Sequence, residues 1–563
     1  MDYKQIISDL INIEGTSKEE IYSLLSFPKD SSMGDYCLPC FKFAKTLRKS
    51  PIQIAQDIQA TISVGGVIES VEAVSGYVNF KLNKVELAKQ VLQDIDNEKE
   101  MYGSSKIGEG KTVCIDFSSV NIAKPFHMGH MLNTAIGSAL YKLYKYLGYN
   151  VVGINHLGDW GTQFGKLIVA YKKWGNKEDI EKRGVKGLLD IYVRFHKEAE
   201  SDPTLDDEAR AWFKKIEDNN EEAINLWQWF KEITLKEVDK VYKRLNVTFD
   251  SYNGESFYND KMESVLDELR QKGLLVESEG AQIVKFKDED KMPPCLLVRS
   301  DGATLYATRD LAAAFYRKKT YNFDKCLYVV AYQQNLHFKQ WFKVVEMMGY
   351  DWYKDLYHVA HGMVSLEDGA LSTREGHVVF LEDVLNTSKE KALKVIEEKN
   401  PNLPNKEEVA EQVGVGAVMF GMLYNSRIKD ITFSYDKVLS FEGETGPYVQ
   451  YTYARCNSLI EKCGLVQGEI DYKGIDNEDA ADVIIVLDRF KDTLLDAANK
   501  NEPYIISRYA IELAQAFNKF YFNCNIANEE QGIKNSRLLL TNAVKQVLKN
   551  ALNLIGIATP NKM

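Results

Sequence analysis

The organisation of this chain follows from residues 112–149, which read TVCIDFSSVNIAKPFHMGHMLNTAIGSALYKLYKYLGY. Residues 112–117 are mostly apolar and predict a strand, and a polar turn follows over residues 118–130. The next segment predicts a helix, because apolar residues recur at the helical period at Leu132, Ile136, Leu140, Leu143 and Leu147. Gly148 ends that helix, and a strand restarts at residues 151–154. The stretch predicts a βαβ unit whose first turn directs ligand-binding groups at a helix N-terminus.

The polar turn carries two imidazoles in the pattern His127-x-Gly129-His130, with Lys124 shortly before them. A helix N-terminus favours negative charge, and imidazole and ammonium groups add hydrogen-bond donors there. Gly129 lets the backbone approach a ligand closely. A metal site or a structural pair of histidines is the alternative interpretation. The strand before the turn, the helix after it, and the presence of Asn121 and Lys124 favour a polyphosphate site.

Composition sets broad limits on the class of protein. The length of 563 residues predicts about three or four domains, and a hydrophobic content of 45% is typical of a globular protein. We expect no signal peptide after Met1 and no membrane span, because no apolar run approaches ~18 residues. The eight cysteines are scattered, and the pair Cys37 and Cys40 stands alone. We therefore expect reduced thiols and a cytoplasmic location rather than a zinc site or a redox pair.

The net charge of −11 argues mildly against a nucleic-acid binder, although phosphate contacts need only a local basic patch. Residues 1 to about 100 predict a small α/β module. Basic residues cluster on one predicted helix, where a solvated face is the simpler interpretation; they are Lys42, Lys45, Arg48 and Lys49. Residues 74–81 alternate in polarity and predict a half-buried strand that carries Tyr77 and Asn79.

Further site candidates follow later strands. Residues 155–165, NHLGDWGTQFG, lie just past the carboxyl end of a predicted strand, where open α/β sheets bind ligands. A tight structural turn would give the same pattern. Residues 166 to about 245 are rich in helix formers and charge and predict an insertion into the sheet, and strands return at residues 280–297.

Tyr306 and Asp310 are spaced so that a phenol and a carboxylate can address one ligand group. If both are helical, they share a face, and if Thr308 is the N-cap, Asp310 lies in the first turn. A carboxylate is the natural partner of a guanidinium, through paired hydrogen bonds. The alternative is that Asp310 is only an acid at a helix start.

A second strand–helix–strand pattern runs from residue 326 to residue 361, and its exit loop contains Gln333, Gln334 and His337. This pattern predicts the second half of a split nucleotide-binding sheet. From about residue 395 the pattern is helical. An apolar stripe there predicts core packing, at Ile506, Tyr509, Leu513, Phe517 and Phe520.

Together these motifs resemble the class I aminoacyl-tRNA synthetases, and residues 119–130 and 306–310 resemble the arginyl-tRNA synthetases in particular. The resemblance implies an α/β fold: a Rossmann-like parallel-sheet catalytic domain at residues 106–395, with an insertion at about 166–295. It also implies a small N-terminal α/β domain at residues 1–105 that contacts tRNA, and an all-helical anticodon-binding domain at residues 396–563.

The resemblance assigns roles to the residues that match the family motifs. The expected ATP ligands are His127, Gly129, His130 and His337, and the expected catalytic residues include Lys124, His127 and His130. The expected arginine site comprises Asp116, Ser119, Val120, Asn121, Tyr306, Asp310 and Gln334, with Gln333 as an alternative to Gln334. The expected tRNA contacts are Tyr77, Asn79, Tyr448 and Gln450.

One segment departs from the family pattern. Class I synthetases carry a Lys-Met-Ser-Lys-Ser loop that stabilises the leaving pyrophosphate, whereas residues 370–379 here read ALSTREGHVV. Ser372 and Arg374 keep a hydroxyl and a cation, and we expect both to be catalytic, with Lys124 supplying the missing charge. The departure leaves a catalytically weak, tRNA-binding paralogue as one alternative. A class I synthetase for another amino acid is a second, against which Tyr306 and Asp310 argue.

The implied reaction activates L-arginine with ATP to arginyl-adenylate and transfers the arginyl group to the 3′ end of tRNA(Arg). We expect Mg²⁺ to enter with ATP and no metal to be bound by the protein alone, because no carboxylate cluster is visible. The expected partners are therefore tRNA(Arg), L-arginine and ATP, without a membrane, for a monomer. The family also implies that bound tRNA is needed before arginine is activated.

Overall fold

The computed structural model describes residues 3–28, 30, 33–367, 379–464, 466 and 468–563. The chain forms two compact units, and the C-terminal helices contribute to both. The first unit comprises Met1–Tyr102, Cys456–Phe490 and Glu512–Val547, and the second comprises Gly103–Arg455, Lys491–Ile511 and Leu548–Met563.

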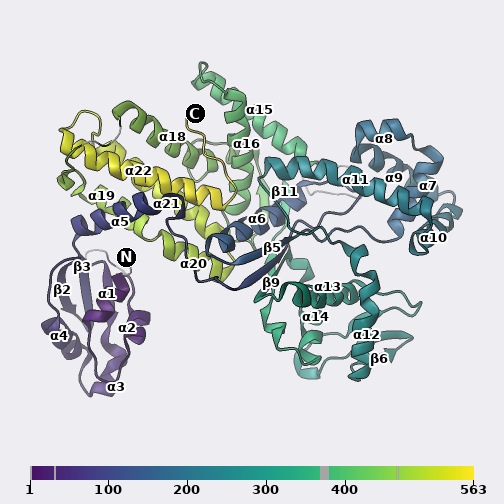
Figure 1. The fold of residues 1–563 in the computed structure, drawn as a ribbon, viewed down its shortest axis with the longest axis horizontal. Helices are drawn as coiled ribbons and strands as arrows, with labels where there is room; N and C mark the ends of the chain where they lie inside the picture. The colour runs from purple at the N-terminus through teal and green to yellow at the C-terminus, as the bar shows by residue number, and fades with distance from the viewer. Residues whose placement is uncertain (1–2, 29, 31–32, 368–378, 465, 467) are drawn as a thin grey trace. The chain divides into compact units, whose positions relative to one another are not determined.

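The first unit contains a three-stranded antiparallel sheet in the order β1-β3-β2 (Figure 1). Its N-terminal elements are α1 (Tyr3–Leu10), α2 (Lys18–Leu24), β1 (Tyr36–Pro39), α3 (Ala44–Leu47), α4 (Pro51–Thr61), β2 (Ile68–Val74), β3 (Tyr77–Leu82) and α5 (Lys84–Glu98). The central strand β3 buries Val78 and Phe80, and α4 packs against β2 and β3. The predicted small α/β module is confirmed.

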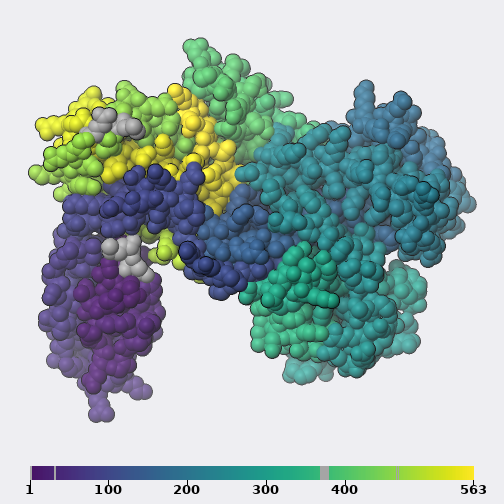
Figure 2. Space-filling view, viewed as in Figure 1, coloured from purple at the N-terminus to yellow at the C-terminus, as the bar shows by residue number. Residues whose placement is uncertain are grey.

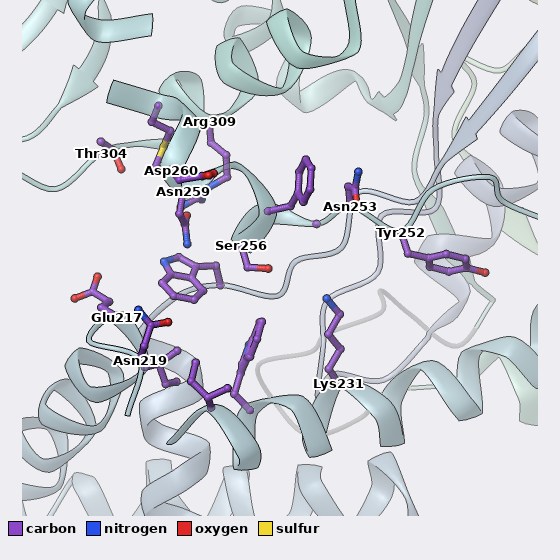
Figure 3. A pocket seen from close by; sticks show the side chains of 17 residues that line it. Glu217, Asn219, Lys231, Tyr252, Asn253, Ser256, Asn259, Asp260, Thr304 and Arg309 are labelled. Carbon is purple, nitrogen blue, oxygen red and sulfur yellow. The ribbon is translucent and has the colours of Figure 1, made fainter. Parts of the chain in front are cut away.

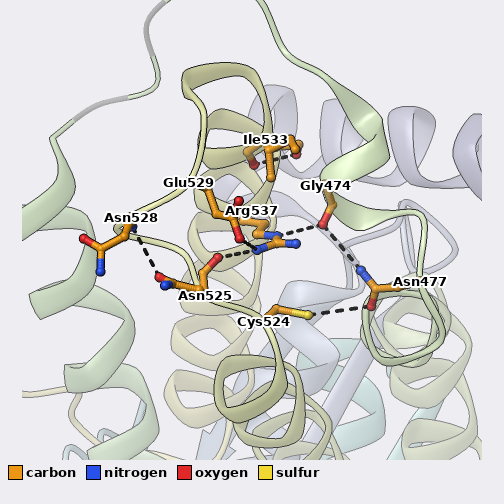
Figure 4. A network of polar contacts seen from close by, with 9 residues as sticks. Gly474, Asn477, Cys524, Asn525, Asn528, Glu529, Ile533 and Arg537 are labelled. Carbon is orange, nitrogen blue, oxygen red and sulfur yellow. Dashed lines mark hydrogen bonds and ion pairs between the residues drawn. The ribbon is translucent and has the colours of Figure 1, made fainter.

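The C-terminal helices are α18 (Gly446–Cys463), α19 (Glu478–Asp488), α20 (Phe490–Lys500), α21 (Tyr504–Asn523) and α22 (Gln531–Leu554). All five residues of the predicted apolar stripe in α21 are buried. Arg537 of α22 joins neighbouring segments of the first unit: its Nε donates to the Gly474 carbonyl at 2.9 Å, and its Nη1 lies 2.9 Å from Glu529 (Figure 4). Arg537 therefore stabilises the packing of these segments through several contacts of one side chain.

The second unit is built on a four-stranded parallel sheet in the order β10-β9-β4-β5. Its strands are β4 (Thr112–Asp116), β5 (Asn150–Ile154), β9 (Lys325–Ala331) and β10 (Leu356–His361), and helices α6 (Met131–Tyr146) and α14 (Asn335–Met347) connect them. The predicted βαβ unit is confirmed, and the apolar face of α6 is buried against the sheet. Strand β5 lies on one side of β4, and β9, the next strand of this sheet along the chain, lies on the other side. The sheet order thus reverses between β4 and β9, the position where such sheets bind ligands.

Long insertions separate β5 from β9. The first is helical, with α7 (Thr162–Trp174), α8 (Lys177–Arg183), α9 (Val185–Ala199), α10 (Thr204–Glu217) and α11 (Glu221–Arg244). These helices form one continuous body in the space-filling view (Figure 2). The chain continues through α12 (Met262–Gln271) and an antiparallel sheet of β6 (Leu275–Ser278), β7 (Ala281–Val284) and β8 (Cys295–Val298), and then α13 (Tyr306–Tyr321) leads to β9.

The segment after β10 differs from the expected all-helical pattern in one respect. Helices α15 (Leu381–Lys399), α16 (Lys406–Leu423) and α17 (Tyr435–Val438) are present, but the strand β12 (Ile431–Phe433) lies among them. It pairs in parallel with β11 (Val364–Leu366). The sequence pattern missed β12 because so short a strand depends on a partner far away in the chain.

Candidate active site

The candidate site lies at the carboxyl edge of the parallel sheet, where the sheet order reverses. The motif His127-x-Gly-His130 follows β4, and the segment that contains Gln334 and His337 follows β9. Because β4 and β9 are adjacent and parallel, their exit segments open at the same edge of the sheet.

Both imidazoles of the motif accept a hydrogen bond from the backbone. Nδ1 of His127 accepts from the Gly129 amide at 3.0 Å, and Nδ1 of His130 accepts from the His127 amide at 3.3 Å. Burial, with Lys124 as a second cause, lowers the pKa of His127 below its ordinary value. Burial and the neighbouring His127 lower the pKa of His130 to about 3. A neutral imidazole whose Nδ1 accepts carries its proton on Nε2, so each ring presents one N–H donor for an anion.

The turn before the histidines holds a strained backbone in place. Ser118, Ser119 and Ala123 have φ values of 69°, 48° and 59°, in the left-handed region that non-glycine residues rarely adopt. The insertion helix α11 contacts this turn twice: the Tyr242 hydroxyl lies 2.7 Å from Ser118 Oγ, and Thr234 Oγ1 accepts from the Ala123 amide at 3.0 Å. The helical insertion thus supports the conformation of the turn, which sequence reasoning missed because these contacts are distant in the chain.

Residues 155–165, which follow β5, also support the turn after β4. Asp159 in this run is fully buried and accepts from Lys231 Nζ of α11 at 2.7 Å and from Ser256 Oγ at 2.8 Å. Gly158 allows a close approach to Asn121, because a Cβ on Gly158 would lie 2.2 Å from Asn121 Oδ1. This run therefore positions the turn of β4 and the insertion relative to each other.

The N-terminal part of α13 carries the predicted substrate-reading pair. The helix begins at Tyr306 after the N-cap Leu305, so Thr308 is not the N-cap. Tyr306 is 68% exposed, and the Asp310 carboxylate oxygen Oδ2 lies 2.5 Å from His337 Nε2. His337 therefore contacts the carboxylate expected to read arginine, although sequence reasoning placed it on the nucleotide side. Because His337 is in the first turn of α14, this contact places Asp310 beside the carboxyl end of β9.

A second carboxylate, Glu255, was missed in the sequence and lies close to this pair. Burial raises the pKa of Glu255 to about 7; Arg309 opposes that shift, and the charge of Asp310 adds to it. Glu255 lies 3.5 Å from Arg309, which borders a cavity of about 730 Å³ together with Trp160, Lys231 and other residues (Figure 3). Figure 3 shows Lys231 extending from α11 toward the segment that carries Ser256. No sequence motif marks Glu255, which a distant segment brings to α13.

The other residues expected to bind arginine occupy several environments. Asp116 ends β4, where its carboxylate accepts from Ser119 Oγ at 3.0 Å and pairs with Arg317 at 2.7 Å. Val120 is buried, and its carbonyl accepts from the Gly158 amide at 2.9 Å. Asn121 is exposed, and Gln334 ends the turn before α14 with its side chain exposed.

Lys124 is exposed, and no ion pair of its ammonium is seen within the part of the chain that the structure describes. Ser372 and Arg374 lie outside the described residues. Residues 379–381 contact the histidine motif through the backbone. The Met128 amide donates to the Val379 carbonyl at 3.4 Å, and the Leu381 amide donates to the Phe126 carbonyl at 2.9 Å.

Two of the expected tRNA contacts need correction. Asn79 is only 4% exposed, because β3 is the central strand of its sheet, and Gln450 is fully buried. Nε2 of Gln450 donates to the carbonyls of Gln412 and Ala558 at 3.1 and 2.8 Å, so this amide joins elements of the second unit. Tyr77 is exposed and Tyr448 is partly exposed, so both keep a surface that a nucleic acid can contact.

Within the described ranges, no group of three or more His, Cys, Asp or Glu side chains is arranged to hold a metal ion. None of the helices in the described part of the chain combines the length and apolar character needed to span a bilayer.

Comparison with known proteins matches the whole chain to one family. Residues 91–435 match the catalytic domain of class I tRNA synthetases (R), residues 1–82 match the arginyl tRNA synthetase N-terminal domain, and residues 449–563 match the DALR anticodon-binding domain. The chain is 55% identical to the arginine–tRNA ligase of Clostridioides difficile (strain 630) and 52% identical to that of Alkaliphilus metalliredigens (strain QYMF), each time over 100% of both chains. The fold matches that of Thermus thermophilus arginyl-tRNA synthetase with a TM-score of 0.80 at 25% identity, covering 96% of each chain.

Proposed function

The chain belongs to the arginyl-tRNA synthetase family, and we propose that it is an ATP-dependent arginine–tRNA ligase. In the first step, a carboxylate oxygen of arginine attacks the α-phosphorus of ATP, and pyrophosphate leaves. In the second step, a terminal ribose hydroxyl of tRNA(Arg) attacks the arginyl carbonyl, and AMP leaves as the hydroxyl loses its proton. Similarity to arginine–tRNA ligases over the full length supports this function and lends no support to an inactive paralogue.

In this proposal, the motif after β4 binds ATP. An arginine carboxylate is already ionised at neutral pH, so the first step depends on positioning and charge rather than on a protein base. The Nε2–H groups of His127 and His130 would donate to phosphate oxygens, close to the backbone at Gly129, and Lys124 would offset the charge that develops on the leaving pyrophosphate. Mg²⁺ bound to ATP would add charge at the same phosphates. Ser372 and Arg374 remain proposed partners in this step.

In this proposal, α13 and its neighbouring segments bind the side chain of arginine. The pairing of Asp310 with His337 carries the proposal, because it sets an oriented carboxylate at the edge of the sheet where the phosphate-binding turn also opens. A guanidinium placed between Asp310 and Glu255 would relieve the repulsion between these carboxylates. Tyr306 and Gln334 would complete this end of the site. Because a partly buried carboxylate that a ligand desolvates without pairing is costly, amino acids that lack a guanidinium would be rejected.

The opposite end of the amino acid would be held at the turn after β4. Ser119, the backbone at Val120 and the Asn121 amide supply donors and acceptors there, and Asp116 offers a negative charge for the amino group. Tyr77 and Tyr448 remain proposed tRNA contacts. The eight free cysteines suit a reducing cytoplasm, where we place the reaction.

The test is aminoacylation of total tRNA with each amino acid in turn, using ATP and the full chain. We expect charging with arginine alone. Asp310→Ala should lower kcat/KM for arginine by about a hundredfold or more, since a charged hydrogen bond is lost, while the exposed neighbour Asp301→Ala serves as the matched control. Lys124→Ala should lower kcat by a similar factor, with exposed Lys145→Ala as its control. Charging with another amino acid, or undiminished arginine charging by Asp310→Ala, would overturn the assignment.

A further inference from the structure

Arg317 is a buried cation at the centre of the second unit. It lies on α13, is 1% exposed, and places Nη2 2.7 Å from Asp116 Oδ2 of β4 and 3.4 Å from His156 Nδ1 after β5. Its guanidinium carbon lies 5.3 Å from the ring centre of Tyr328, a residue of β9. One side chain on α13 thus contacts the two strands at which the sheet order reverses and the exit segment of a third strand.

Arg317 shares a helix face with the residue proposed to read arginine. Asp310 and Arg317 are seven positions apart, which corresponds to about two helical turns and a rise of about 10 Å. Tyr306 lies a further turn toward the N-terminus on the same face. The contact of Arg317 with Asp116 therefore restrains both the rotation and the axial position of the helix segment that carries Asp310.

The partner of Arg317 belongs to the other half of the site. Oδ1 of Asp116 accepts from Ser119 Oγ at 3.0 Å, and Ser119 lies in the strained turn that leads to His127. The carboxylate of Asp116 thus links the turn on the nucleotide side, through one oxygen, to α13 on the arginine side, through the other.

We propose that Arg317 is a positioning residue that sets the distance between the guanidinium-reading face of α13 and the nucleotide-binding turn after β4. This inference rests on the proposed function. It assigns Arg317 no contact with substrate, because its guanidinium is enclosed by Asp116, His156 and Tyr328. Among the residues that the structure describes, the buried atoms Nε and Nη1 of Arg317 have no hydrogen-bond partner, so most donors of this guanidinium are unused. A residue that served packing alone would more easily be apolar, since buried ion pairs are poor contributors to stability.

The experiment compares Arg317→Lys with the double variant Asp116→Asn/Arg317→Met. Lysine keeps the charge, but its shorter side chain ends one bond before the position of Nη2, the atom that contacts both Asp116 and His156, so it cannot keep both contacts. The double variant removes both charges and leaves no unpaired buried ion, which guards against unfolding. Each is assayed by aminoacylation for the KM of arginine, the KM of ATP, and the inhibition constant of citrulline, whose ureido group replaces the guanidinium.

We expect a rise in the KM of arginine of about tenfold to a hundredfold for both variants, because Asp310 is displaced from its productive position. The KM of ATP should change by less than about twofold, because the variants displace α13 rather than the phosphate-binding groups. The preference for arginine over citrulline should fall by a factor similar to the rise in KM. Arginine and citrulline have the same α-amino group. Any effect of Asp116 on the binding of that group therefore cancels in the ratio of the two constants.

Arg537→Lys is the matched control, because Arg537 is a largely buried arginine, with a side chain 14% exposed and several partners, but lies in the first unit. It should lower the melting temperature without changing the preference for arginine over citrulline. If both Arg317 variants fold and keep the wild-type preference, the positioning role is wrong, even if their melting temperatures fall. If the wild-type protein forms no arginyl-tRNA, the proposed function itself fails, and the two failures are thus distinguishable.

Discussion

The Nε2 atom of His337 lies 2.5 Å from Oδ2 of Asp310. The imidazole thereby fixes the orientation of a carboxylate that is only partly buried, and among the described residues no hydrogen bond to the second oxygen of Asp310 is seen. A carboxylate held in one orientation loses less entropy when it binds a guanidinium than one that rotates freely. The pairing joins α13 to α14, two helices that come from different segments of the interrupted sheet.

His337→Ala should raise the KM of arginine by about tenfold, because Asp310 loses the hydrogen bond that orients it. The KM of ATP should stay close to the wild-type value. Steady-state aminoacylation with each substrate varied in turn measures both constants. A selective rise in the KM of ATP would instead place His337 on the nucleotide side, as the family resemblance implies.

The binding of arginine should weaken as the pH falls below about 7. The pKa of Glu255 is raised to about 7, chiefly by burial, so its carboxylate takes up a proton below that pH and loses its attraction for a guanidinium. The KM of arginine, measured from pH 8 to pH 5.5, should rise toward acid. Glu255→Gln should have a higher KM that varies less over this range. An unchanged pH profile in this variant would exclude Glu255 from the arginine site.

His130 should make the folded state less stable in acid. Its folded pKa of about 3 lies below its ordinary value of 6.5, so the unfolded chain binds more protons between these values. Stability from this group is therefore complete above pH 6.5 and is lost as the pH falls toward 3. Thermal melts from pH 8 to pH 4 should show a smaller acid-side decline for His130→Gln than for wild type. Equal declines would show that His130 takes up its proton as easily in the folded state.

Gln450 should matter for stability rather than for tRNA binding. Gln450→Leu leaves the carbonyls of Gln412 and Ala558 without their donor, at a cost of about 1–3 kcal/mol in the free energy of unfolding. Denaturation in urea measures this loss, and aminoacylation with varied tRNA measures the KM of tRNA. The partly exposed Tyr448→Ala, two residues earlier, is the comparison in which the KM of tRNA should rise. A larger effect on that KM from Gln450→Leu than from Tyr448→Ala would show that Gln450 contacts tRNA despite its burial.

The sequence predicts the parts of the site that rest on local pattern. The strand, the turn and the helix around His127 and His130 follow from polarity and periodicity within one stretch, and the structure confirms that βαβ unit. The sequence could not show that Glu255 lies beside Arg309, because that proximity depends on how separate insertions fold. The same limit applies to burial: a strand pattern predicts alternation at Asn79, but not that its strand is the central one of the sheet.

The contacts of Tyr242 and Thr234 with the strained turn have a practical consequence for protein engineering. A shortened catalytic core without residues 166–245 would keep every motif recognised in the sequence. It would also lose the hydroxyl groups that hold Ser118 and Ala123 in their unfavourable backbone conformations. We expect such a trimmed protein to relax at the loop before His127 and to bind nucleotide poorly unless new contacts replace those of α11.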